Sequence, residues 1–236
     1  MMLRDYIQKA QKRIIERVDN FYSPTGIHIY FKDHLFDETV DVEKVVSDLE
    51  SLVPTQLLNE IEMIIIGHFD EFDERNINAF YKDGAIYVSN IQDNNADLLD
   101  DLIHETSHAV EIAYGQEIYA DNRIKDEFLR KRIHLYDLLW SLDFKAPKSV
   151  FLEPEYNEEF DEFLFKNIGY NKLSEIMMGL FLSPYAATSL SEYFATGFTE
   201  FYLHPNDHSF LKKISPQLYS KIQKINNEEL LDNEYK

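Results

Sequence analysis

The pentapeptide His104-Glu105-Thr106-Ser107-His108 constrains this chain more than any other stretch, because it has the form HExxH. The apolar residues before it recur with a helical period, namely Leu98, Leu99, Leu102 and Ile103. Positions i and i+4 lie on one face of a helix, so His104 and His108 can reach the same metal ion. Glu105 is placed to act as a general base toward a metal-activated water instead of binding the metal. The motif therefore predicts a catalytic site with one Zn²⁺ per chain.

The composition fits a single folded domain. The chain has 236 residues, 44% of them hydrophobic, with 17 Phe and 15 Tyr, which is ample for a packed core. A net charge of −20 argues against nucleic acid or an anionic membrane as partner, because phosphate binding needs Lys and Arg. The absence of Cys excludes disulfides, thiol nucleophiles and cysteine ligands to zinc. We expect a monomer whose partner is a protein or peptide substrate.

The sequence leaves the location of the protein open. The charged residues 1–13 lack the apolar core of a signal peptide, and the apolar run 176–182 is too short to span a bilayer. These features favour a cytoplasmic protein or one delivered by a non-classical route.

The two halves of the chain have different patterns. In the first half, apolar runs and turn residues predict strands at 27–31, 62–67, 79–81 and 85–89, helices at 3–21 and 42–52, and an acidic loop at 70–74. Lys82-Asp83-Gly84 predicts a hairpin turn, and Asn94 or Asn95 a cap for a helix that runs to Gly115. The second half predicts a loop at 145–156 and helices at 122–142, 157–166, 172–182, 189–203 and 216–225. We therefore expect an α+β fold with an α/β lobe over 1–115, a helical lobe over 116–236, and an active-site cleft between them.

A catalytic zinc site needs a third protein ligand. His204 and His208 follow a predicted helix, but beside Pro205 and Asp207 they resemble loop residues. Glu192 is an isolated acid among apolar neighbours within a predicted helix. That pattern also fits an ordinary solvated helix face.

The segments HETSHAVEIAYG, Tyr185 and SEYFATGF together resemble the catalytic domain of the anthrax lethal factor-like metallopeptidases. This group of gluzincins also includes the secreted Pro-Pro endopeptidases. The likeness extends in scattered pieces over residues 60–226 and implies a zincin-like fold and zinc-dependent endopeptidase activity. It implies His104, His108 and Glu192 as ligands, Glu105 as base, and Tyr185, seven residues before Glu192, as the donor to the oxyanion.

Two features depart from the pattern of that family. Eighty-three residues separate His108 from Glu192, which predicts an insertion within 122–172. Thr196 also stands where the family often has an acidic residue, four positions after the metal Glu.

Two further roles are predicted around the motif. Glu111, three residues after His108 on the same helix face, could orient a ligand, although an ordinary surface role explains it equally well. The strand 85–89 leads toward the HExxH helix, so we expect Ala85, Tyr87 and Ser89 to form an exposed edge that pairs with an extended substrate. The alternatives to an endopeptidase are a zinc hydrolase of a non-peptide amide and a non-catalytic interaction or structural protein that keeps the fold.

Overall fold

The computed structural model describes residues 20–37, 39–75 and 77–227. The chain has a mixed α and β fold, as expected, with the strands in its first half and helices throughout its second half. It divides into two compact units, Met1–Thr106 and Ser107–Lys236. The division falls inside helix α5 (Asn95–Tyr119), whereas the sequence placed it after residue 115.

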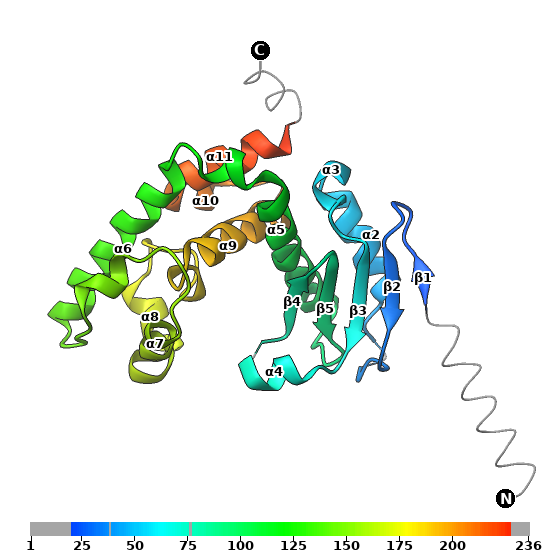
Figure 1. Ribbon diagram of the computed structural model, residues 1–236, viewed down its shortest axis with the longest axis horizontal. Coiled ribbons are helices and arrows are strands. Elements are labelled where there is room, and N and C mark those ends of the chain that lie inside the picture. The colour runs from blue at the N-terminus through cyan, green and yellow to red at the C-terminus, as the bar shows by residue number, and fades with distance from the viewer. Residues whose placement is uncertain (1–19, 38, 76, 228–236) are drawn as a thin grey trace, which may run out of the picture. The chain divides into compact units, whose positions relative to one another are not determined.

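The first unit contains a five-stranded mixed sheet with the order β1-β2-β3-β5-β4, visible in Figure 1. Its central strand β3 runs parallel to both β2 and β5, and the outer strands β1 and β4 are antiparallel to their neighbours. The strand bounds are Phe21–Tyr22, His28–Phe31, Met63–Gly67, Ala79–Lys82 and Ala85–Ser89 for β1 to β5. The β-branched residues Ile64 and Ile66 of β3 are completely buried, which explains why this short apolar run forms a central strand.

The position of β5 corrects one prediction from the sequence. β5 pairs with β3 along one side and with β4 along the other, so Ala85–Ser89 is an interior strand. The prediction that Ala85, Tyr87 and Ser89 form an exposed edge is therefore wrong. Strand order depends on contacts between distant segments, and the local pattern of 85–89 carries no information about it. Among the described strands the sheet ends at β1 and β4, so an added strand would have to pair there.

The hairpin between β4 and β5 confirms the predicted turn. Asp83 and Gly84 both have positive φ, 49° and 83°, the conformation that a two-residue type I′ turn requires. Asp tolerates this region better than most residues, and Gly adopts it without steric penalty.

Helix α2 (Val42–Leu52) matches its predicted bounds, and the Asp41 side chain caps it by accepting from Lys44 N at 3.0 Å. The short helix α3 (Thr55–Leu58) follows it. The predicted acidic loop at 70–74 is wrong, because Asp70–Arg75 forms helix α4. Its acidic residues Asp70, Glu71 and Asp73 lie in the first turn, where the helix dipole favours negative charge, and Phe72 is buried. For the predicted helix at 3–21, residues 3–19 lie outside the described part of the chain, and Phe21 belongs to a strand.

Helix α5 begins as predicted but does not end where predicted. The Asn94 side chain accepts from the backbone N–H groups of Ala96 and Asp97 at 2.8 and 3.1 Å, so Asn94 is the cap. The helix extends to Tyr119 and contains a break at Tyr114, whose φ and ψ are −117° and 19°.

The helices of the second unit are α6 (Arg123–Ser141), α7 (Glu158–Glu162), α8 (Tyr170–Ile176), α9 (Leu190–Leu203), α10 (Ser209–Ile214) and α11 (Pro216–Asn226). Short 3₁₀ segments, η1 (Lys148–Leu152) and η3 (Tyr185–Ala187), and a π-helical turn, η2 (Phe163–Ile168), connect them. The predicted helix at 172–182 ends at Ile176, because a turn follows in which Gly179 has a φ of 78°. The predicted loop at 145–156 contains η1.

Helices α6, α9 and α11 pack against one another. The Glu127 carboxylate of α6 accepts from Tyr193 OH at 2.9 Å and from the backbone N–H groups of Gln217 and Leu218 at 3.0 and 3.2 Å. Gly197 of α9 lies against Leu218, and a Cβ at residue 197 would be 2.2 Å from Leu218 Cδ2.

No helix in the described part of the chain is long and apolar enough to cross a membrane.

Candidate metal centre

The HExxH residues gather on one part of α5. One potential ligand atom from each of His104, Glu105 and His108 lies within 4.8 Å of the others. The two intervening residues, Thr106 and Ser107, are completely buried, and Thr106 Oγ1 donates to Leu102 O at 2.7 Å. The helix is thus anchored through its buried residues, while both histidines remain partly accessible.

Glu192 lies beside His108 in the second unit. Ser189 caps α9 by accepting from Glu192 N at 3.1 Å, which fixes the first turn of that helix. Glu192 Oε1 is 3.9 Å from His108 Nε2. The predicted third ligand is therefore close to a predicted imidazole ligand, although 83 residues separate them in the sequence.

Tyr185 lies on η3, and its hydroxyl donates to Glu192 Oε1 at 3.1 Å. Burial, and then the negative charge of Glu192, raises the pKa of the Tyr185 phenol well above its usual range. The hydroxyl consequently keeps its proton at neutral pH and can act as a donor.

The turn that carries Tyr185 is held by a buried arginine. Arg132 of α6 is 1% exposed, and its guanidinium donates to the carbonyls of Ala187 and Thr188 at 2.9 and 3.2 Å. Thr188 Oγ1 also donates to Tyr185 O at 2.8 Å. These bonds fix the connection between Tyr185 and the start of α9.

Glu111 also lies next to His108, as the helical spacing predicted. Its Oε2 is 3.1 Å from His108 Nδ1 and accepts from Ser191 Oγ at 2.6 Å, and its Oε1 accepts from the Tyr119 hydroxyl. Sequence analysis missed Ser191 and Tyr119. The position of Ser191 next to Glu192 was a usable signal, whereas nothing in the local sequence relates Tyr119 to Glu111.

The alternative histidines have other partners. His208 Nε2 is 3.0 Å from Phe201 O, and its ring stacks on Phe201 with centroids 4.1 Å apart. His204 Nδ1 is 3.3 Å from Glu200 O. Both residues lie in the loop between α9 and α10, as the sequence predicted.

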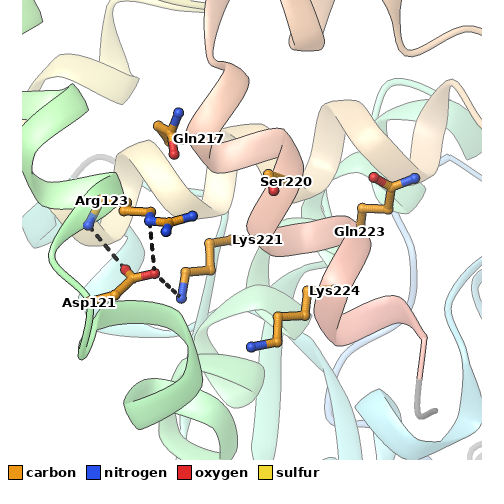
Figure 2. Close-up of a pocket in the computed structure, with 7 residues that line it drawn as sticks. All are labelled: Asp121, Arg123, Gln217, Ser220, Lys221, Gln223 and Lys224. Atoms are coloured by element: carbon orange, nitrogen blue, oxygen red, sulfur yellow. Dashed lines mark hydrogen bonds and ion pairs between the residues drawn. The ribbon is translucent and has the colours of Figure 1, made fainter. Parts of the chain in front are cut away.

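The residues proposed from β5 contribute to the sheet. Ala85 and Ser89 are buried, and the Tyr87 ring stacks on Phe80 of β4 with centroids 4.6 Å apart. A pocket elsewhere in the second unit is formed by α11, by Asp121 between α5 and α6, and by Arg123 at the start of α6, as Figure 2 shows. There Lys221 Nζ lies 3.0 Å from Asp121 Oδ2 and donates to Glu117 O at 2.6 Å. None of the predicted site residues lines this pocket.

The donor set suits zinc. Two imidazoles and a carboxylate are common protein ligands of a catalytic Zn²⁺. Ligand atoms bound to one tetrahedral zinc lie about 3.3 Å apart, given metal–ligand distances near 2.0–2.1 Å. The 3.9 Å between His108 Nε2 and Glu192 Oε1 is close to that separation. Small side-chain movements would suffice to bring these two atoms to one ion.

Comparison with known proteins gives no independent assignment. No protein-family model, no curated protein and no solved structure matches this chain significantly.

Proposed function

We propose that this protein is a zinc-dependent endopeptidase of the gluzincin type with a zincin-like fold. His104, His108 and Glu192 would hold one Zn²⁺, with Glu105 as general base and Tyr185 as donor to the oxyanion. The observation that carries the proposal is the position of Glu192 beside His108, the second histidine of HExxH, with the Tyr185 hydroxyl hydrogen-bonded to Glu192. A zinc centre accounts for the placement of both residues, which lie on α9 and on η3, far from HExxH in the sequence.

Each residue has a chemical task in peptide hydrolysis. When bound, Zn²⁺ supplies Lewis-acid activation of water and of the scissile carbonyl. Glu105 accepts the proton of the attacking water and delivers it to the departing amine. The Tyr185 hydroxyl exchanges its acceptor, Glu192, for the oxyanion and stabilises the negative charge that develops there.

The decisive experiment combines metal analysis with cleavage of a proteome-derived peptide library. We expect about one zinc per purified chain, and peptide cleavage that a chelator abolishes and added zinc restores. Glu105→Ala should retain zinc and lose at least ~100-fold in turnover, the scale of general-base catalysis. Glu175→Ala, at an exposed glutamate of α8, is the matched control.

Three outcomes would overturn the proposal in different ways. Full activity of Glu105→Ala would exclude the mechanism. A zinc-loaded protein that cleaves a non-peptide amide but no peptide would identify a different hydrolase. A chain that binds zinc and hydrolyses neither class would have a non-catalytic role.

The same preparation tests the ligand assignment. Glu192→Gln should weaken zinc binding sharply, because it replaces a carboxylate ligand with a neutral amide. His204→Ala and His208→Ala should leave the zinc content unchanged. Zinc loss in the His208 variant, with Glu192→Gln unaffected, would reverse the assignment.

A further inference from the structure

Glu111 is the acceptor at the centre of a hydrogen-bond network around His108. One carboxylate oxygen, Oε2, lies 3.1 Å from His108 Nδ1 and accepts a hydrogen bond from Ser191 Oγ at 2.6 Å. The other, Oε1, accepts from the Tyr119 hydroxyl. We propose that Ser191 and Tyr119 are positioning residues that act through Glu111 to fix the orientation and proton position of His108 for metal binding. This inference rests on the proposed function.

The donors and acceptors determine which nitrogen of His108 carries the proton. A carboxylate oxygen accepts hydrogen bonds, so the 3.1 Å contact of Glu111 Oε2 with His108 Nδ1 requires a hydrogen on Nδ1. The neutral imidazole then has its lone pair on Nε2, the nitrogen that lies 3.9 Å from Glu192. A network that selects the Nδ1–H form therefore prepares the correct nitrogen as a ligand.

Ser191 links the two helices that carry the ligands of the second unit. Its hydroxyl donates to Glu111 on α5, and its Oγ is 3.3 Å from His108 Nδ1. The next residue along α9 is Glu192. The Ser191–Glu111 bond consequently fixes the first turn of α9 against α5, and with it the distance between Glu192 and His108.

Tyr119 reaches Glu111 from the far end of α5. In a straight helix eight residues correspond to about 12 Å along the axis, a long span for two side chains. The helix is interrupted at Tyr114, between the two residues, and there it departs from regular geometry. The Tyr119 ring also packs edge-on against Phe194 of α9, with centroids 6.3 Å apart. The phenol is thus held on both sides and presents its hydroxyl to Glu111.

The first test is the zinc dissociation constant of the purified protein, measured by competition with a chromogenic chelator. Loss of a partner of a histidine ligand typically weakens metal affinity 10- to 100-fold. We expect that range for Glu111→Ala and about 10-fold for Ser191→Ala and Tyr119→Phe. Ser191→Thr keeps the hydroxyl and should restore most of the affinity. In a Glu111→Ala background neither Ser191→Ala nor Tyr119→Phe should weaken binding further, because both act through Glu111.

Matched controls separate this role from a general loss of stability. Tyr202 lies on α9, as Ser191 does, and Tyr202→Phe removes the hydrogen bond from its phenol to Asn226. Ser174→Ala removes an exposed hydroxyl on α8. Both should leave zinc affinity unchanged even where they lower the melting temperature. Equal losses of zinc affinity in the controls and in the network variants would overturn the proposal.

The second test needs no metal. Nitrogen-15 NMR of the histidine side chains, recorded on the zinc-free protein above the ordinary imidazole pKa of about 6.5, reports the tautomer of His108. We expect the Nδ1–H form in the wild type and a shift toward the Nε2–H form in Glu111→Ala, with smaller shifts in Ser191→Ala and Tyr119→Phe.

The two measurements distinguish a failure of the positioning role from a failure of the proposed function. Zinc binding with the same affinity and tautomer in all three variants would overturn the positioning role and leave the proposed function standing. A wild type that binds no zinc, but whose His108 tautomer changes as expected, would overturn the proposed function and support the network. An Nε2–H wild type would overturn the network itself.

Discussion

Asp101 shows how burial changes the chemistry of an ordinary residue. It lies on α5, three residues before His104, and its Oδ2 accepts from Gln92 Nε2 at 3.1 Å. Burial raises the pKa of the Asp101 carboxyl from 3.8 to about 6, against the opposing effect of the Gln92 hydrogen bond. The folded state therefore holds this proton more tightly than the unfolded state, so stability falls as pH rises between about 4 and 6.

Asp101→Asn should remove this pH-dependent loss of stability. Near pH 4 the wild type and the variant should be similar, and above pH 6 the variant should be more stable by up to about 3 kcal/mol, the equivalent of roughly two pKa units. Urea unfolding of the zinc-free protein at both pH values measures the difference, with the exposed Asp137→Asn as control. A variant that is less stable than wild type at neutral pH would show that the ionised carboxylate is stabilised in the fold.

Tyr185→Phe separates catalysis from packing at a single hydroxyl. If Tyr185 only packs, the variant loses one hydrogen bond to Glu192, roughly 1 kcal/mol of stability, and keeps its turnover. As an oxyanion donor it should keep zinc and KM and lose ~100- to 1000-fold in kcat. Steady-state kinetics on a cleaved peptide decide between the two. Turnover within a few-fold of wild type would exclude the oxyanion role.

At the scale of helices and strands, local sequence signals predicted the elements whose ends depend on local chemistry. The side chains of Asp41 and Ser189 accept hydrogen bonds from backbone N–H groups at the starts of α2 and α9, and Asp83-Gly84 forms the expected turn. The predicted loop at 70–74 is wrong because an acidic run, although typical of a solvated loop, also favours the start of a helix.

The cap of α9 gives a prediction at this scale, because that helix carries both Glu192 and Ser191. Ser189→Ala removes the acceptor of Glu192 N and should lower stability by about 1 kcal/mol. For a chain of this length that corresponds to a fall of about 2–4 °C in Tm, measurable by thermal unfolding. Ser189→Asp retains a capping oxygen and should keep the wild-type Tm. Equal losses in both variants would indicate that packing of the buried hydroxyl, not capping, sets the effect.

The candidate site was predictable only in part. The i, i+4 spacing of the histidines and the i, i+3 spacing to Glu111 are local, so the sequence alone suggested both. The prediction that Glu192 lies near His108 depended on the family resemblance. The contact of Tyr119 with Glu111 was not predicted, because it spans the break in α5 at Tyr114. The interior position of β5 depends on long-range strand order, which no local pattern encodes.

At the scale of the whole molecule, zinc binding should raise the free energy of unfolding. A ligand that binds only the folded state stabilises it by about 4 kcal/mol when its concentration is 1,000 times its Kd. With about 2–4 °C per kcal/mol for a chain of this size, saturating zinc should raise Tm by about 8–16 °C over the chelated protein. Differential scanning calorimetry measures this shift, which Glu192→Gln should largely abolish and His208→Ala should preserve. An identical Tm with zinc and with chelator would argue against a structured zinc site.

The contact between Gly197 and Leu218 has a consequence for sequence variation. A Cβ at residue 197 would lie 2.2 Å from one methyl carbon of Leu218 and 2.8 Å from its Cγ, so α9 and α11 approach each other only because residue 197 lacks a side chain. Substitutions at these two positions are therefore not independent during evolution. A related chain with Ala or Ser at the position of Gly197 should carry a smaller residue, or a leucine in another rotamer, at that of Leu218.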